Sequence, residues 1–204
     1  MLDYYVVGAD LAQGELALAH DEEEIDVRRV GRWAFHFGFY MSSSHKQIVA
    51  KCRLYVHSRK IDILEPLGRG DQGEVFATTR RTAIKALHHD VDYRRERDVY
   101  LRLRERGVNA IRGCAVPQLQ GFDDDLLVVE MTIVRPPCLV DFASAYLDTR
   151  PEFPPDVVAA EQMRHRETFG ETWPLVAEII EQLAGLGIHL MDISAGNIRV
   201  SVGS

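Results

Sequence analysis

Residues 67–75 read LGRGDQGEV, a glycine-rich stretch. Its glycines Gly68, Gly70 and Gly73, together with Val75, follow the pattern G-x-G-x-x-G-x-V. Glycine permits a tight turn whose backbone can approach phosphate oxygens closely. The stretch therefore predicts a phosphate-binding turn, although a purely structural turn is the alternative for the glycines taken alone.

The flanks of this stretch distinguish two kinds of nucleotide site. A dinucleotide-binding fingerprint needs a helix directly after the third glycine. Here Glu74 to Thr79 alternates like a strand, and Ile61 to Leu67 before the glycines also has the composition of a strand. The pattern favours a strand–turn–strand hairpin and speaks against the dinucleotide fold.

A lysine and a glutamate follow the glycines. Lys85 stands within a further predicted strand, Thr82 to Leu87, and a helix is predicted from Val91 to Arg106. On that helix Glu96 falls on the apolar face, where a carboxylate is costly unless it is paired. We therefore expect an ion pair between Lys85 and Glu96; a solvated Glu96 is the alternative.

A second group of polar residues reads GIHLMDISAGNIRV at residues 187–200. Asp192 and Asn197 are predicted to lie in a loop between a helix and a short strand. A carboxylate there can orient a substrate hydroxyl and accept its proton, and an asparagine amide oxygen can bind Mg²⁺.

In this order, the motifs resemble those of the protein-kinase-like superfamily, over about residues 61–200. The resemblance implies a two-lobed α+β fold, with an antiparallel β-rich N-lobe and a truncated helical C-lobe. It implies ATP and Mg²⁺ as cofactors, Asp192, Lys85 and Glu96 as catalytic residues, and Asn197 as a metal ligand. The nucleotide-binding residues that it implies are Gly68, Gly70, Gly73, Val75, Ala83, Lys85, Glu130 and Met131, the last two at the hinge.

The chain also departs from that family. Leu190-Met191 stands where conventional protein kinases have His-Arg, and Ser194 stands where Ser/Thr kinases have lysine. No Asp-Phe-Gly and no acidic residue follows Asn197. We therefore expect the second metal-binding aspartate, the activation loop and the distal helical lobe to be missing.

Three functions follow from this balance of matches and departures. The first is an ATP-dependent phosphotransferase acting on a hydroxyl acceptor. The second is a nucleotide-binding pseudokinase or interaction module. The third is a truncated or split kinase whose protein partner supplies the missing aspartate.

We predict an N-terminal extension at residues 1–58 and a kinase-like domain at residues 59–204, divided into lobes at 59–131 and 132–204. The extension is predicted to be β-rich, or to be a partner-binding module, from the apolar runs Tyr4 to Val7, Trp33 to Phe39 and Ile48 to Val56. Further strands are predicted at Ala115 to Leu119 and Leu126 to Thr132. The later helices are predicted at Val140 to Leu147, Pro155 to Thr168 and Trp173 to Leu186.

Composition narrows the class of protein. The chain has 204 residues and a formal net charge of −7, which argues against nucleic acid as a partner. No apolar stretch approaches the roughly 20 residues that span a bilayer, so no membrane association is expected.

The three cysteines, Cys52, Cys114 and Cys138, are scattered and form neither a disulfide framework nor a zinc set, which favours a reducing, cytoplasmic location. We interpret His88 and His89 as a solvated turn rather than a metal pair.

Overall fold

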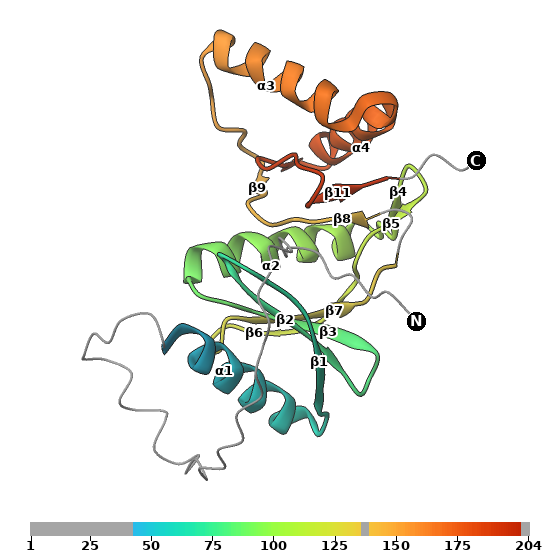
Figure 1. The fold of residues 1–204 in the computed structure, drawn as a ribbon. Coiled ribbons are helices and arrows are strands. Elements are labelled where there is room, and N and C mark those ends of the chain that lie inside the picture. The colour runs from blue at the N-terminus through green and yellow to red at the C-terminus, as the bar shows by residue number, and fades with distance from the viewer. Residues whose placement is uncertain (1–42, 136–138, 201–204) are drawn as a thin grey trace.

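A computed structural model describes residues 43–135 and 139–200 of the chain. The predicted runs Tyr4 to Val7 and Trp33 to Phe39 lie outside the described residues. The described part is an α+β structure (Figure 1). Its longer elements are α1 (Ser43–Arg59), β1 (Ile63–Gly70), β2 (Gly73–Thr78), β3 (Thr82–Leu87), α2 (Asp90–Glu105), β6 (Leu119–Asp123), β7 (Val128–Thr132), α3 (Pro155–Phe169) and α4 (Trp173–Gly185).

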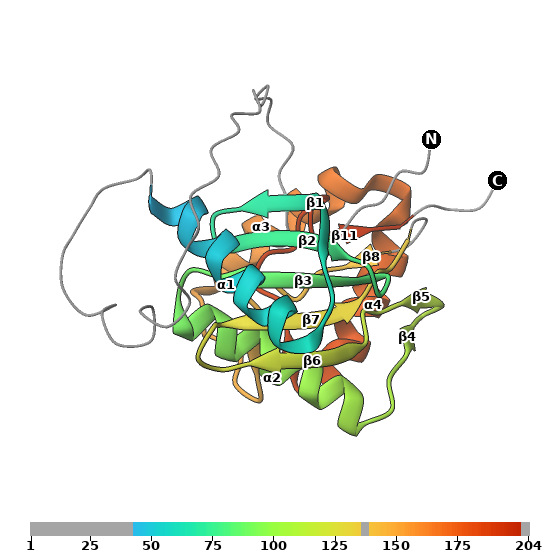
Figure 2. The ribbon, with the colours of Figure 1, turned by 90° about the horizontal axis from the view of Figure 1, so that it is seen from below.

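Five strands form one antiparallel sheet in the order β1-β2-β3-β7-β6. Tight turns join β1 to β2 and β2 to β3, whereas α2 lies in the connection from β3 to β6. β2 and β3 are buried along their whole length. The sheet is therefore covered on both faces, by α1 on one and by α2 on the other (Figures 1 and 2).

Each helix contributes its own core. α1 packs Ile48, Cys52 and Tyr55 against the sheet residues Phe76 and Ile84. α2 buries Tyr93, Glu96, Val99, Tyr100 and Leu103 on the other face. This second core continues into the C-terminal part of the chain, where α4 contributes Val176, Ile179 and Leu183.

The C-terminal part is held together by two short ladders between segments far apart in the sequence. β8 (Leu139–Val140) pairs with β11 (Ile198–Arg199), and β9 (Tyr146–Leu147) pairs with β10 (Ile188–His189). In the chain, α3 and α4 come after β8 and β9 and before β10 and β11. The two helices project together from the same side of the molecule (Figure 1). Another short pair, β4 (Ala110–Ile111) and β5 (Cys114–Ala115), precedes β6.

Two predicted elements are wrong. Ile48 to Val56 belongs to helix α1 and not to a strand, because Ile48, Cys52, Tyr55 and Val56 recur at helical spacing and are the residues that α1 buries. Val140 to Leu147 is not a helix but the β8–turn–β9 segment. Its backbone is extended because its partners β11 and β10 come from much later in the chain, which local composition does not reveal.

The other predicted elements agree with the structure more closely. The strands around the glycines, the helix over residues 91–106 and the two later helices are confirmed to within a few residues. The strand predicted at Ala115 to Leu119 is divided between β5 and β6.

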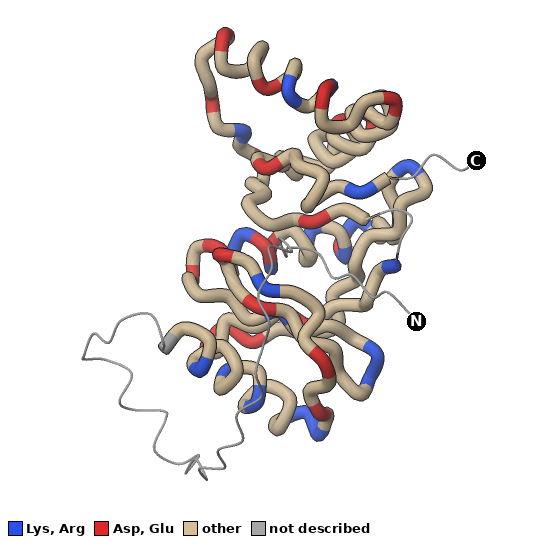
Figure 3. Tube along the Cα trace, viewed as in Figure 1, with Lys and Arg blue, Asp and Glu red and all other residues tan. Residues whose placement is uncertain are grey.

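The surface and the cysteines add further facts. Basic and acidic residues are interspersed over the described chain (Figure 3). Within residues 43–135 and 139–200, no helix has the length and apolar character needed to cross a membrane.

Cys52 is a free, buried thiol, whereas Cys114 is disulfide-bonded. The expectation of cysteines without a disulfide is therefore wrong for Cys114, because separation along a sequence does not measure distance in space. The predicted cytoplasmic location rested in part on that expectation and is weakened.

Candidate active site

The glycines lie in the hairpin between β1 and β2, as predicted. Gly70 faces Gly73 across the hairpin, and Asp71 and Gln72 form its turn. A Cβ atom on Gly73 would lie 2.2 Å from the carbonyl oxygen of Ala86 on β3. Only glycine therefore fits at position 73, and the reason is close approach between two strands.

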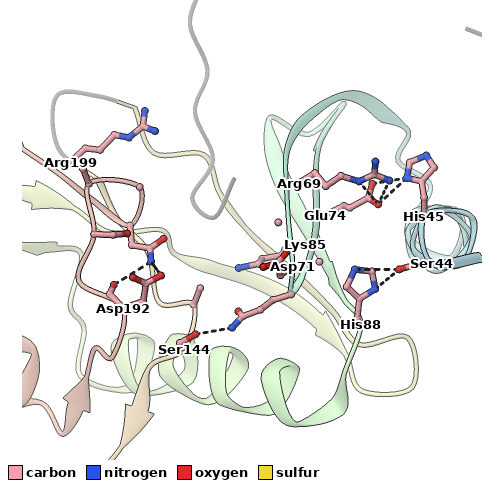
Figure 4. A pocket seen from close by; sticks show the side chains of 18 residues that line it. Ser44, His45, Arg69, Asp71, Glu74, Lys85, His88, Ser144, Asp192 and Arg199 are labelled. Atoms are coloured by element: carbon pink, nitrogen blue, oxygen red, sulfur yellow. Dashed lines mark hydrogen bonds and ion pairs between the residues drawn. The ribbon is translucent and has the colours of Figure 1, made fainter. Parts of the chain in front are cut away.

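A cavity of about 1160 Å³ opens beneath this turn. Its walls come from segments that are far apart in the chain: the first turn of α1, the glycine turn, the turn after β8 and the loop between β10 and β11. Asp192 lies on one side of the cavity and the glycine turn on the other (Figure 4). The prediction that Asp192 and Asn197 face the glycine turn across a cleft is thus confirmed.

Lys85 and Glu96 meet as predicted. The Lys85 Nζ lies 2.7 Å from the Glu96 Oε2, and both side chains are almost completely buried. β3 directs Lys85 toward α2, and the helical phase of Glu96 turns its carboxylate toward the sheet. The pair therefore anchors the lysine at the cavity wall.

Asp141 is a site residue that the sequence analysis missed. It follows β8, is 1% exposed, and places its Oδ1 4.0 Å from the Lys85 Nζ. Its backbone N–H donates a 2.7 Å hydrogen bond to the carbonyl oxygen of Asn197. The ladder between β8 and β11 thus brings a carboxylate from earlier in the chain to the backbone of Asn197, which the search for an acidic residue after Asn197 could not reveal.

These buried groups carry an excess of negative charge. Burial alone would lower the pKa of Lys85, but the charges of Asp141 and Glu96 outweigh burial and raise it, so the ammonium stays charged. One ammonium then stands between two carboxylates. Among the described residues the Asp141 Oδ2 has no hydrogen-bond partner, whereas the Glu96 Oε2 is paired with the Lys85 ammonium. Such a cluster favours the approach of a further cation.

Asp192 and Asn197 are joined directly. The Asn197 Nδ2 donates to the Asp192 Oδ2 at 2.5 Å and to the Asp192 carbonyl oxygen at 3.2 Å. Asp192 itself is exposed to the cavity, whereas Asn197 is buried. Because the amide nitrogen is occupied, the Asn197 Oδ1 is the atom left to bind a cation.

The outer rim of the cavity involves α1, which the sequence analysis did not predict. His45 Nδ1 lies 2.8 Å from the Glu74 Oε2, and the Arg69 guanidinium donates to the Oε1 of the same carboxylate. Ser44 Oγ is 3.0 Å from the His88 Nδ1, so His88 is not a freely solvated turn residue. These contacts fasten the start of α1 to the glycine hairpin (Figure 4).

Several predicted nucleotide-binding residues do not line the cavity. Gly68 lies within β1, and Val75 and Ala83 are buried in the core shared by the sheet and α2. Glu130 and Met131 lie inside β7, which is flanked by β3 and β6. The prediction that their backbone groups are free at a hinge is therefore wrong, because both edges of their strand are already paired.

One sequence signal points to Asp141. Residues 139–143 read Leu-Val-Asp-Phe-Ala, an apolar pair followed by an acidic residue, an aromatic residue and a small one. This stretch precedes Asp192 in the chain, whereas the kinase pattern predicts an acidic ligand only after Asn197. Within the described residues no group of three or more His, Cys, Asp and Glu side chains could hold a metal ion by itself.

The comparisons with known proteins add no family. No family model matches the chain, and no curated protein matches it. The function must therefore be argued from the geometry of the cavity.

Proposed function

We propose that the chain is an ATP-dependent phosphotransferase with a kinase-like two-lobed fold. The observation that carries the proposal is a connected set of side chains, of which Lys85, Asp192 and Asn197 line the cavity while Glu96 and Asp141 are buried next to Lys85. Lys85 is held between Glu96 and Asp141, Asp141 is paired through its backbone with Asn197, and Asn197 binds Asp192. Phosphoryl transfer needs this combination of a fixed cation, metal ligands and a carboxylate for the acceptor.

Each side chain has a distinct role in the proposal. Lys85 binds phosphate oxygens of ATP, and Glu96 holds Lys85 in position from behind. The glycine turn covers the phosphates with backbone N–H groups. Asp192, the exposed carboxylate, orients the acceptor hydroxyl and accepts its proton as the oxygen attacks the γ-phosphate. Catalysis then consists of positioning and charge stabilisation.

The residues present also fit Mg²⁺. The unpartnered Asp141 Oδ2 and the Asn197 Oδ1 are oxygen ligands, and Mg²⁺ is usually bound by one or two carboxylates together with substrate phosphates. Bound Mg²⁺ would neutralise the charge that develops on the transferred phosphoryl group. Its charge would also offset the excess of negative charge around Lys85.

The proposal treats Asp141-Phe142-Ala143 as the counterpart of the kinase Asp-Phe-Gly segment in a changed chain order. Conventional protein kinases have that segment after the catalytic loop. Here it precedes Asp192, and the ladders β8–β11 and β9–β10 return it to the catalytic loop. On this view the second metal-binding aspartate is not missing but permuted.

The test measures binding and transfer separately. Mg²⁺-ATP should raise the melting temperature of the wild-type chain, because a ligand that binds only the folded state stabilises it. The double variant Lys85→Met with Glu96→Gln removes the cation together with the charge of its nearest carboxylate, and it should lose this shift. Slow hydrolysis of γ-labelled ATP, with water standing for the acceptor hydroxyl, should fall in Asp192→Asn while the thermal shift remains.

Two results would contradict the proposal in different ways. No thermal shift of the wild-type chain at millimolar ATP would exclude nucleotide binding. A shift without any hydrolysis or self-phosphorylation would instead identify a pseudokinase that holds nucleotide without transferring phosphate.

A further inference from the structure

One hydrogen bond spans the cavity from the glycine turn to the opposite wall. The Gln72 Nε2 donates to the Ser144 Oγ at 2.8 Å. Gln72 lies in the turn between β1 and β2. Ser144 lies in the turn between β8 and β9 (Figure 4). Both residues line the cavity. The contact therefore joins two walls that belong to different ladders.

The backbone on both sides holds these two residues in place. The carbonyl oxygen of Gln72 accepts a 2.9 Å hydrogen bond from the N–H of His88, which fixes the glycine turn from behind. Ser144 has a φ of +62°, in the left-handed region that serine rarely adopts. The N–H of Ala145 donates to the carbonyl oxygen of Phe142 and closes the turn around Ser144. The surrounding structure thus maintains an unfavourable backbone conformation that presents the Ser144 hydroxyl to Gln72.

The same turn is tied to the buried carboxylate. The Asp141 Oδ1 accepts a 2.9 Å hydrogen bond from the N–H of Ala143, the residue before Ser144. The position of Ser144 therefore depends on the position of Asp141. A change at the Asp141 carboxylate is transmitted to the glycine turn through two hydrogen bonds.

We propose that Gln72 and Ser144 form a latch that keeps the glycine turn closed over the cavity and that must open for nucleotide to enter or leave. The proposal rests on the nucleotide-binding function proposed above. A single neutral hydrogen bond is weak, so the latch can open thermally, and its loss should change rates by about three- to tenfold. Gln72 and Ser144 are positioning residues in this scheme.

The test is a stopped-flow measurement with a fluorescent N-methylanthraniloyl derivative of ATP and Mg²⁺. It compares the wild-type chain with Gln72→Ala, Ser144→Ala and the double variant. Each single variant should raise the dissociation rate about three- to tenfold, and the double variant should do no more than either single one, because both remove the same contact. Gln120→Ala removes an exposed glutamine of β6 and serves as the matched control, with unchanged rates.

A further variant separates the hydroxyl from the backbone. Ser144→Gly removes the hydroxyl and relieves the left-handed strain, so its dissociation rate should rise as in Ser144→Ala while its melting temperature does not fall. Unchanged rates in the variants, or additive effects in the double variant, would overturn the latch alone. Failure of the wild-type chain to bind the analogue would overturn the latch together with the proposed function.

Discussion

The two faces of the five-stranded sheet bury carboxylates in opposite ways. On the α1 face the Glu130 Oε2 accepts a hydrogen bond from the Tyr55 hydroxyl at 3.0 Å, and its Oε1 accepts one from the Thr82 hydroxyl at 2.6 Å. On the α2 face Glu96 is held by the Lys85 ammonium, but the Asp141 Oδ2 has no hydrogen-bond partner in the part of the chain that the structure describes. Buried polar groups are normally satisfied, so each exception requires an explanation.

This difference separates a structural carboxylate from one that the proposed function assigns to a ligand. The environment of Glu130 is complete within the protein and holds α1 against the sheet. In the proposed function, the environment of Asp141 would be completed by a bound cation. The two carboxylates can therefore be compared directly, one by its effect on stability and the other by its effect on turnover.

The largest expected effect is on catalysis. Asp141→Asn keeps the size of the side chain and an oxygen for the N–H of Ala143 but removes the negative charge. Turnover should fall about 100-fold or more, because stabilisation of transition-state charge by a metal contributes several kcal/mol. Glu130→Gln should retain its turnover per folded molecule. Steady-state ATP hydrolysis at saturating Mg²⁺-ATP measures both, and equal losses in the two variants would remove the distinction between the faces.

For the free energy of unfolding, the order should be reversed, with a larger loss at Glu130 than at Asp141. Glu130→Ala leaves the Tyr55 and Thr82 hydroxyls buried without their acceptor and should cost about 1–3 kcal/mol. Asp141→Asn should be neutral or stabilising, because it relieves the excess of buried negative charge. Urea unfolding followed by circular dichroism measures both values. A large destabilisation by Asp141→Asn would mean that this carboxylate is structural after all.

Gly73 lies in β2, within the sheet that both faces share, so a substitution there should affect the two faces alike. Gly73→Ala would force the new methyl group against the Ala86 carbonyl oxygen and should destabilise the sheet by about 1–3 kcal/mol. Gly185→Ala is the matched control, because at the end of α4 no described atom beyond its own helical turn lies within 4 Å of the added Cβ. Thermal melts of the two variants test the contrast, and equal melting temperatures would contradict the tight approach of β2 to β3.

The smallest expected effect is a pH dependence at the point where α1 meets the cavity rim. Burial lowers the pKa of His88 from its usual value of 6.5, although the nearby Glu74 opposes this. The folded state then binds fewer protons at His88 than the unfolded state, so stability should fall as the pH drops below about 6.5. In His88→Gln this decline should be shallower. Urea midpoints at pH 7.5, 6.5 and 5.5 provide the test, and parallel profiles would contradict the prediction.

The α2 face was more predictable from the sequence than the rest of the site. The approach of Lys85 to Glu96 followed from a strand and a helix that are adjacent in the chain, because helical phase determines which face carries Glu96. Asp141 was missed because residues 140–147 are rich in apolar side chains, which suggested a helix. Their extended conformation depends on pairing with β11, which comes much later in the chain. The α1 face was misread because β-branched residues suggested a strand, although the spacing of Ile48, Cys52 and Tyr55 is helical.

The two-residue ladder between β8 and β11 also determines when Asp141 can reach Asn197. β1, β2 and β3 are joined by tight turns, so these strands can pair early through local contacts. β8 can pair with β11 only after the long segment that contains α3 and α4 has closed into a loop. Closing that loop costs entropy before any contact is gained. A folding intermediate that already has the glycine turn and Lys85 would still lack Asp141 beside Asn197. In the native state, the amide of Asp141, which donates to the Asn197 carbonyl oxygen, should be among the first to exchange with solvent when this ladder opens locally, with the sheet still intact.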